Sequence, residues 1–209
     1  MHRASKRLPV KPFVGSSDIT ALHLAFRRLL GIETFFGPTV AGPILGNPEP
    51  STETLESLRN ALFEKCSQSS FSGDQVLVPG IAGGIAIGGT LTIISSFAGT
   101  PELPAATGAV VLLEDVGESP YRIDRMLTQL LRSNWFNEVA GIACGSWERC
   151  GGQQRIHSVL LDRLSGLGVP IVTGLPFGHG EIQMTIPLGA EVQLDGNNGT
   201  LQFVPREIP

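Results

Sequence analysis

The sequence has few cysteines and lacks a long uninterrupted run of apolar residues. Cys66, Cys144 and Cys150 are odd in number, and no second close pair or nearby histidine accompanies them. Neither a disulfide framework nor a zinc site is therefore predicted, and we expect ordinary thiols of a cytosolic protein. The most apolar stretch, 76–98, is interrupted by Pro79 and several glycines. This pattern predicts a buried strand and helix rather than a membrane span.

Positive charge is also scarce. The chain has 15 lysines and arginines against 19 aspartates and glutamates, a net charge of −4, and its basic residues are spread along the sequence. Because nucleic-acid binding needs a basic surface stripe, we expect no nucleic-acid partner. The first ten residues are basic, but no apolar segment follows them, so no signal peptide is predicted. We expect a cytoplasmic protein with no membrane partner.

A strand, a sharp turn and a helix are predicted around Ser17. The apolar run Val10–Val14 indicates a strand, which Pro12 makes irregular or late, and apolar residues recur at helical spacing after Asp18. Such a nucleophile elbow exposes the serine oxygen and points the first N–H groups of the helix at a developing oxyanion. The motif is not G-x-S-x-G, because Ile19 stands where the second glycine would be. The alternative is that Ser17 or Asp18 merely caps the helix.

Two further residues could complete a catalytic triad with Ser17. Glu114 follows the predicted strand 109–113, and His179 lies between two glycines in a loop, which is an unusual place for a buried structural histidine. An imidazole can take the proton of a serine, and a carboxylate can fix the tautomer of the imidazole. The residues alone leave Glu114 and Asp115 open as the carboxylate.

His23, His157 and Asp124 are assigned structural roles, and the role of Trp147 stays open. His23 lies within the first predicted helix, and His157 is expected to open a later helix. Asp124 is expected to be a solvated or paired charge on a helix. Trp147 either lines a substrate cleft or covers the core, and the sequence leaves both open.

Several segments, in the right order, resemble the L,D-carboxypeptidase family of serine peptidases. This family includes muramoyltetrapeptide carboxypeptidases and microcin C self-immunity peptidases. Its nucleophile segment resembles VGSSDITALHLAF, its acidic segment resembles VVLLEDVGESPYRIDRMLTQL, and its histidine loop resembles VTGLPFGHG. Two further family segments are similar to GGTLTIISSFAGTP and IPLGAEVQLDGNNGTLQF. The resemblance covers nearly the whole chain.

The resemblance implies a catalytic triad of Ser17, Glu114 and His179, with the backbone N–H of Asp18 in the oxyanion hole and no metal or other cofactor. It implies hydrolysis of the amide bond that releases terminal D-alanine from a murein tetrapeptide, in peptidoglycan recycling. The expected partner is therefore a small peptide or muropeptide, and a homodimer is compatible with the resemblance. The alternative within the family is hydrolysis of a peptidyl-adenylate, as in the microcin-immunity branch.

The resemblance also implies the fold, which is of the α/β class. We expect the remnant of a Rossmann-like N-terminal domain that carries the nucleophile elbow, over 1–70 with its linker. A mixed β/α C-terminal domain with a swivelling β-barrel-like core is expected over 71–209. Family members carry a substantial segment before the nucleophile, where this chain has sixteen residues. An inactive truncated fragment is thus the alternative to a working enzyme. Thr90 also departs from the family, which has asparagine at this position.

The remaining pattern predicts alternating helices and strands. We expect a loop-rich connection over 31–50, and then a helix over 51–64 with its leucines on one face. Tight glycine turns are expected after Gly80, before a helix over 90–98. Further predictions are helices that begin at Ser119 and His157, strands over 75–78, 139–144 and 169–173, and a hairpin around DGNNG.

Overall fold

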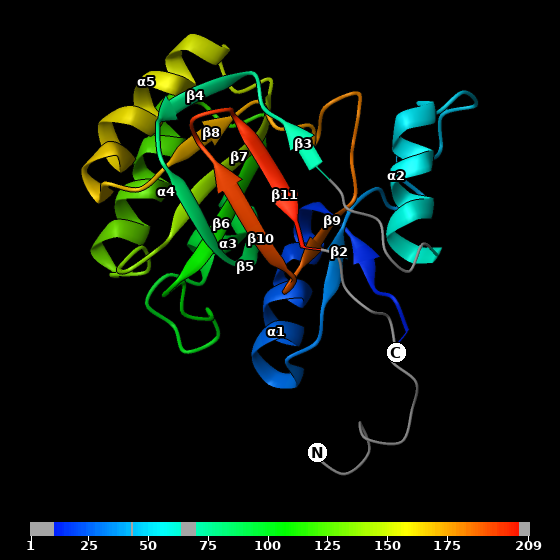
Figure 1. The fold of residues 1–209 in the computed structure, drawn as a ribbon, viewed down its shortest axis with the longest axis horizontal. Coiled ribbons are helices and arrows are strands. Elements are labelled where there is room, and N and C mark those ends of the chain that lie inside the picture. Colours follow the sequence, from blue (N-terminus) through cyan, green and yellow to red (C-terminus); the bar gives the residue numbers. More distant parts are fainter. Residues whose placement is uncertain (1–10, 43, 64–69, 205–209) are drawn as a thin grey trace.

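The structure is a computed structural model that describes residues 11–42, 44–63 and 70–204, and its main element is an eight-stranded sheet (Figure 1). The strands lie in the order β3-β11-β10-β5-β6-β7-β8-β4. Parallel strands occupy the centre: β5 (Ile81–Thr90), β6 (Ala109–Val116), β7 (Gly141–Glu148) and β8 (Ile171–Thr173). Antiparallel strands flank them: β3 (Ser70–Ser72), β4 (Gln75–Val78), β10 (Glu191–Asp195) and β11 (Thr200–Phe203). This architecture confirms the α/β class and the DGNNG hairpin.

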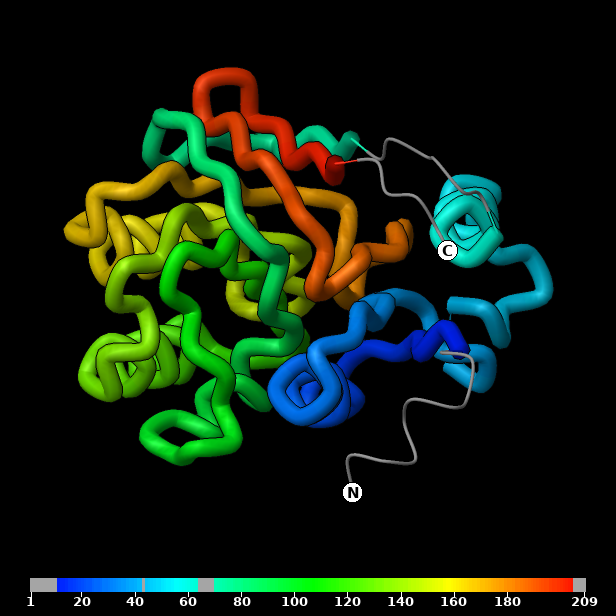
Figure 2. The backbone as a smooth tube through the Cα atoms, turned by 60° about the horizontal axis from the view of Figure 1, so that its bottom comes forward, coloured from blue at the N-terminus to red at the C-terminus, as the bar shows by residue number. Residues whose placement is uncertain are grey.

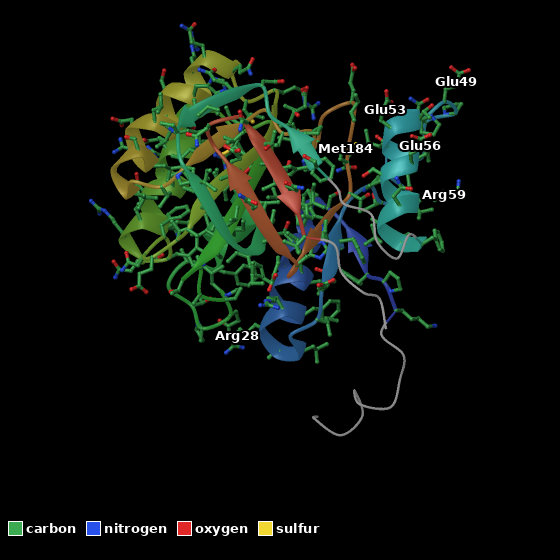
Figure 3. All side chains as sticks on the ribbon, viewed as in Figure 1. Arg28, Glu49, Glu53, Glu56, Arg59 and Met184 are labelled. Carbon is green, nitrogen blue, oxygen red and sulfur yellow. The ribbon has the colours of Figure 1, made fainter. Side chains whose placement is uncertain are left out.

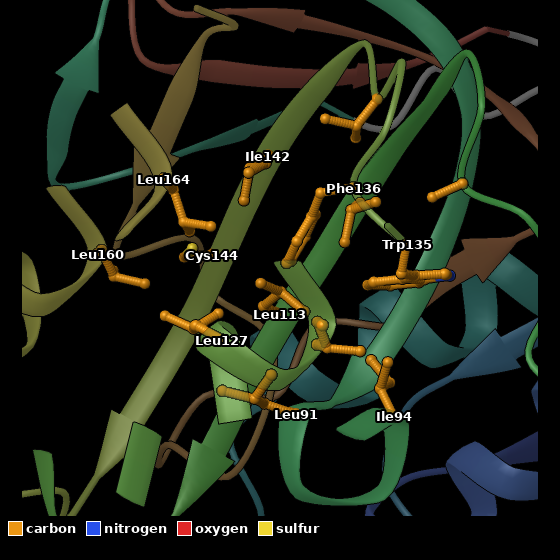
Figure 4. Packing of buried hydrophobic residues seen from close by; sticks show 14 of the residues in the cluster. Leu91, Ile94, Leu113, Leu127, Trp135, Phe136, Ile142, Cys144, Leu160 and Leu164 are labelled. Atoms are coloured by element: carbon orange, nitrogen blue, oxygen red, sulfur yellow. The ribbon is translucent and has the colours of Figure 1, made fainter. Parts of the chain in front are cut away.

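Three helices connect the parallel strands, because neighbouring parallel strands need a crossover connection. They are α3 (Leu91–Ser96), α4 (Pro120–Arg132) and α5 (Gln153–Leu164). All three contribute to one apolar core on the same face of the sheet. In Figure 4, Leu91, Leu127 and Leu160 of these helices pack near Leu113 and Ile142 of the sheet. The buried side chains hold the helices against the strands and so fix the carboxyl ends of β5, β6 and β7.

A second, three-stranded sheet has the order β1-β2-β9. It comprises β1 (Val14–Gly15), β2 (Thr34–Phe36) and β9 (Ile186–Leu188). Phe36 and Ile186 of this sheet share a buried apolar cluster with Val110 and Leu112 of β6. The helix α1 (Thr20–Leu30) connects β1 to β2 and lies against β5 and α3 (Figure 2). The small sheet thus joins the segment around Ser17 to the segment that follows His179.

The small sheet contains strands from both sides of the predicted domain boundary, since β9 pairs with β2. Much of the stretch that would form this boundary, 64–69, lies outside the described residues, and the division at residue 70 stays a prediction. In the large sheet, β3 and β4 stand at opposite ends of the strand order. The barrel-like core that the resemblance implies is likewise still a prediction.

The predicted glycine turns after Gly80 are wrong, because most of these glycines lie within the ten-residue strand β5. Their role is close approach: a Cβ on Gly88 would lie 2.0 Å from the carbonyl oxygen of Leu112 on the next strand. The backbone of Gly88 also has a φ of +141°, which side chains rarely allow. The strand β2 was likewise not predicted within the connection over 31–50. Its three residues carry no alternating pattern that would reveal it.

The helix α2 (Thr52–Phe63) forms as predicted, but it does not bury the predicted leucine face. Leu55 is 43% exposed, whereas Thr54 is fully buried. The helix stands to one side of the large sheet, and Met184 lies beside it in Figure 3. Hydrogen bonds from the backbone N–H groups of Gln183 and Thr185 to Thr54 and Ser57 attach it to the chain after His179. Within the described ranges, no helix is long and apolar enough to cross a membrane.

Candidate active site

Glu114 and His179 form a hydrogen-bonded pair at the carboxyl edge of the parallel strands. Glu114 lies near the end of β6 with its side chain fully buried, and His179 lies in the loop after β8 with its side chain 22% exposed. The distance from His179 Nδ1 to Glu114 Oε2 is 2.7 Å. Because a carboxylate accepts, Nδ1 donates, and Nε2 is left as the proton acceptor of the neutral ring. Open α/β sheets bind their ligands at this edge.

The surroundings of His179 favour its protonated form. The hydrogen bond to Glu114 is the main cause that raises the pKa of His179 above its ordinary value of 6.5, and the charges of Glu114 and Asp115 act in the same direction. Burial and the charge of Arg149 act in the opposite direction. The ring can therefore take up a proton and hold it, as a general base that later acts as an acid must do.

A bulge in β7 holds the histidine loop in place. The register of β6 and β7 shifts between the pairs of Leu113 and Asp115, so that β7 has an extra residue beside Glu114. Such bulges re-aim side chains near functional sites. Ser146 Oγ in this bulge accepts hydrogen bonds from the backbone N–H groups of His179, at 2.8 Å, and Gly180, at 3.1 Å. The loop is thereby fixed to β7.

Gly178 brings the loop close to the carboxylate. A Cβ at this position would lie 2.7 Å from Glu114 Oε2, and the φ of Gly178 is +110°. Gln183 Nε2 donates a 2.5 Å hydrogen bond to the carbonyl oxygen of Gly178. The backbone N–H of Gln183 in turn donates to Thr54 Oγ1 of α2, at 3.0 Å. The histidine loop is thus anchored on two sides, by β7 and by α2.

Ser17 lies in a sharp turn between β1 and α1. It begins a 3-10 turn, Ser17–Ile19, and its φ of 59° is in the left-handed region. A non-glycine residue in this region costs on the order of 1–2 kcal/mol, and a strained strand-to-helix turn is typical of nucleophile elbows. Ser17 is half-buried and Asp18 is exposed. The N-cap positions of the turn and of α1 are held by Ser16 and Ile19 rather than by Ser17 or Asp18, so the capping alternative gains no support.

The helix that follows Ser17 is hydrogen-bonded to the carboxylate through one residue. Thr20 Oγ1, in the first turn of α1, accepts a hydrogen bond from the backbone N–H of Thr90, at 3.1 Å. The hydroxyl of Thr90 donates to Glu114 Oε1, at 2.5 Å. The structure therefore brings Glu114 and His179 into direct contact and connects the segment of Ser17 to them through Thr20 and Thr90.

Asp115, the alternative carboxylate, has different partners. Its side chain is buried and accepts hydrogen bonds from the backbone N–H and the hydroxyl of Thr92, at 2.8 and 2.7 Å. Asp115 thus fixes the start of α3, while Glu114 bonds to His179. Of the two acidic residues that the sequence left open, only Glu114 has the contact that a triad requires.

His23, His157 and Asp124 have structural surroundings. His23 is buried, its Nε2 donates to the carbonyl oxygen of Gly15 at 2.9 Å, and burial lowers its pKa. His157 does not open α5 as predicted, since the helix begins at Gln153 and His157 is buried in its second turn. Asp124 forms an ion pair with Arg163 of α5, which agrees with the predicted paired charge.

The two described cysteines and Trp147 lie outside the hydrogen-bond network of the site. Cys144 and Cys150 are free and buried, and burial raises the pKa of the Cys144 thiol to about 12. Cys66 lies outside the described residues. Trp147 is half-buried and packs at the margin of the core. Across 11–42, 44–63 and 70–204, no group of three or more His, Cys, Asp and Glu side chains is placed to hold a metal ion.

Comparisons with known proteins show what the chain is similar to. Residues 83–194 match the family described as the LD-carboxypeptidase C-terminal domain. The chain is 47% identical over 194 residues to a protein from Streptomyces coelicolor named as a carboxypeptidase, covering 91% of this chain and 61% of the relative. It is 34% identical over 202 residues to the murein tetrapeptide carboxypeptidase of Pseudomonas aeruginosa, covering 90% of this chain and 64% of the relative. The chain thus spans less than two thirds of the length of these curated relatives.

Solved structures show the same fold. The muramoyltetrapeptide carboxypeptidase from Oxalobacter formigenes superposes with a TM-score of 0.82 at 28% identity, covering 95% of this chain and 70% of that chain. The microcin C7 self-immunity protein MccF in complex with glutamyl sulfamoyl guanosine superposes with a TM-score of 0.84 at 23% identity, covering 95% and 69%. The second likeness concerns the fold alone.

Proposed function

The chain belongs to the LD-carboxypeptidase family, and we propose that it is a serine-type carboxypeptidase with Ser17 as nucleophile, His179 as general base and Glu114 as the orienting carboxylate. The observation that carries this proposal is the 2.7 Å hydrogen bond between His179 Nδ1 and Glu114 Oε2. It leaves His179 Nε2 to accept a proton, as serine hydrolysis requires. The left-handed turn at Ser17 supports the choice of nucleophile.

The first half of the proposed reaction forms an acyl-enzyme. His179 Nε2 takes the proton of the Ser17 hydroxyl while Ser17 Oγ bonds to the scissile carbonyl carbon. The backbone N–H of Asp18 helps to hold the oxyanion, because the first N–H groups of a helical turn have no acceptor within it. His179 then donates its proton to the leaving nitrogen, and the carbon–nitrogen bond breaks.

The second half releases the acid. A water molecule gives a proton to His179 Nε2 and adds its oxygen to the acyl carbon. The bond from that carbon to Ser17 Oγ then breaks, and His179 returns the proton to Ser17. Glu114 keeps the ring in one tautomer throughout and stabilises the imidazolium form, which agrees with the raised pKa of His179. Every proton transfer in this cycle uses a group of the chain or the water that is consumed.

The proposed substrate is a murein tetrapeptide that ends in D-alanine. The support is the name of the Pseudomonas relative, which is 34% identical, and that of the Oxalobacter structure, which is 28% identical. We place the reaction in the cytoplasm, in peptidoglycan recycling. Hydrolysis of a peptidyl-adenylate, suggested by the 27% identity to MccF of Escherichia coli, is the second candidate.

A substrate panel tests this proposal. The purified chain is incubated with the tetrapeptide L-Ala-γ-D-Glu-meso-diaminopimelate-D-Ala, with the same peptide ending in L-alanine, and with an aspartyl-adenylate analogue. Released alanine and nucleotide are measured by mass spectrometry. We expect release of D-alanine from the first substrate alone. A folded chain that cleaves only the adenylate would favour the second candidate, and one that cleaves none of them would contradict the proposal.

A further inference from the structure

Thr90 is the one described residue whose hydrogen bonds lead both to Glu114 and to the helix after Ser17. It stands at the carboxyl end of β5, directly opposite Glu114 in the register of β5 and β6. Its hydroxyl donates to Glu114 Oε1 at 2.5 Å, and its backbone N–H donates to Thr20 Oγ1 at 3.1 Å. Thr90 is only 4% exposed, so it is not placed to contact a substrate.

The hydrogen bond from the Thr90 hydroxyl gives the fully buried carboxylate of Glu114 a second donor besides His179. Glu114 Oε2 accepts from His179, and Oε1 accepts from Thr90. A buried polar group is unfavourable unless hydrogen bonds replace those that it made to water. Two donors on opposite oxygens also fix the rotation of the carboxylate group. The bond from Thr90 therefore keeps Oε2 of Glu114 turned toward His179.

The hydrogen bond from the backbone N–H of Thr90 to Thr20 Oγ1 depends on a close approach between β5 and α1. A Cβ on Gly89 would lie 2.6 Å from Thr20 Oγ1, and the φ of Gly89 is +138°. Only glycine allows the first turn of α1 to rest directly on the end of β5. Thr20 is fully buried there and meets the N–H group of Thr90.

We propose that Thr90 is a positioning residue, whose hydroxyl holds Glu114 in the orientation that His179 needs. Its backbone N–H holds α1, the helix that follows Ser17, against the end of β5. Its role in catalysis rests on the proposed function, whereas its effect on Glu114 and His179 is a property of the folded chain. Thr90 stands where the resemblance implies asparagine, and in this chain its hydroxyl contacts Glu114.

Thr92 offers a matched control two residues later. Its hydroxyl donates to Asp115 Oδ2 at 2.7 Å, so that it also binds a buried carboxylate of β6. Asp115 has no hydrogen bond to His179 among the described contacts. Thr92→Val therefore removes the same kind of bond from the neighbouring acid and should leave His179 oriented.

The experiment is an NMR titration of histidine in the 15N-labelled chain, with the His179 signal assigned by its absence in His179→Gln. The charged groups that act on His179 are Glu114 and Asp115 of β6 and Arg149 after β7, and all three are kept in every threonine variant. In Thr90→Val the pKa of His179 should fall by about half a unit or more toward its ordinary value, because Glu114 loses the donor that keeps Oε2 turned toward His179, and the hydrogen bond that raises this pKa weakens. Thr90→Ser and Thr92→Val should titrate as the unmodified chain does.

Activity provides an independent measurement. Thr90→Val should lower kcat about tenfold with KM little changed, and Thr90→Ser should restore it. Thr20→Val, which removes only the acceptor in α1, should lower kcat without moving the pKa of His179. If Thr90→Val does not fold, Thr90→Ala removes the hydroxyl without adding bulk.

Equal titration of His179 in the Thr90 and Thr92 valine variants would overturn the role of the hydroxyl. An unchanged kcat in Thr20→Val would overturn the tie to the nucleophile helix. A chain with no peptidase activity whose His179 still responds to Thr90→Val would contradict the proposed function and leave the control of Glu114 by Thr90 intact.

Discussion

His179 Nδ1 donates a 2.7 Å hydrogen bond to Glu114 Oε2, although the two residues are 65 positions apart in the sequence. The bond joins the end of a buried strand to an otherwise irregular loop. Its geometry depends on neighbours that hold each partner: Thr90 holds Glu114, and Ser146 holds the backbone of His179.

Glu114 and His179 should act as one unit. We expect Glu114→Gln and His179→Ala each to lower kcat by orders of magnitude, because either change leaves the base misoriented or absent. The double variant should be scarcely slower than the slower single variant, since members of one catalytic unit lose function non-additively. Steady-state kinetics of the three variants checks this. Additive losses in ΔΔG‡ would show that the residues act separately.

Gly178 should tolerate no side chain. In Gly178→Ala the new Cβ would lie 2.7 Å from Glu114 Oε2, in a backbone conformation that alanine rarely adopts. We expect a loss of about 1–3 kcal/mol in the free energy of unfolding and a large fall in kcat. Gly180→Ala is the matched control, because its Cβ meets nothing closer than 3.5 Å. Equal urea midpoints and equal rates for the two variants would contradict the assigned role of Gly178.

The acid limb of the kcat/KM profile should lie above pH 6.5. The proposed base must be neutral in the free enzyme, and the pKa of His179 is raised above this value chiefly by its bond to Glu114. Glu114→Gln should move the midpoint of the residual activity to lower pH. An unmoved limb would mean that another group controls the rate.

The hydrogen bond between His179 and Glu114 should also make the free energy of unfolding depend on pH in a definite direction. The pKa of His179 is higher in the folded than in the unfolded chain, so the folded state holds its proton more tightly. The resulting stabilisation is fully present below the unfolded pKa near 6.5 and is lost as the pH rises through the folded pKa. The difference in unfolding free energy between the unmodified chain and His179→Gln should therefore shrink as the solution becomes alkaline. Denaturant titrations across this range measure it, and a difference that grows with pH would contradict the argument.

Ser146 should affect the chemistry only through the position of the histidine loop. Ser146→Ala leaves the N–H groups of His179 and Gly180 without their acceptor, which should cost about 1–3 kcal/mol. We expect a lower thermal midpoint and a lower kcat. Ser158→Ala removes a hydroxyl bond on the exposed face of α5 and serves as the control. If both variants unfold at the same temperature, the hydroxyl of Ser146 does not hold the loop.

Local patterns predict the parts of the site that lie at element boundaries. The strand–turn–helix around Ser17 and the strand that ends near Glu114 follow from hydrophobic periodicity over a few residues. The sequence pattern cannot distinguish Glu114 from Asp115 as the partner of His179. The bulge in β7 and the loop after β8 decide which carboxylate meets His179, and the structure shows that it is Glu114.

Contacts between distant residues explain what the sequence could not predict. The bond from Gln183 to Thr54 spans 129 positions, and neither residue carries a local signal for it. The helix α2 buries Thr54 rather than Leu55 for the same reason, since its partners are backbone N–H groups of another segment. Gly84 and Gly88 of β5 resemble turn residues in the sequence, but the close backbone carbonyls of Gly108 and Leu112 leave no room for a side chain at these positions.

The most direct measurement of the central claim compares D-alanine release from the murein tetrapeptide by Ser17→Ala and Ser16→Ala. Both serines are half-buried neighbours, and only Ser17 has the left-handed backbone of the turn. With both variants shown to be folded by circular dichroism, Ser16→Ala should stay within about threefold of the unmodified chain, while Ser17→Ala should lose about 10⁴-fold or more in kcat. Comparable release by the two variants would contradict the assignment of Ser17 as the nucleophile of this peptidase.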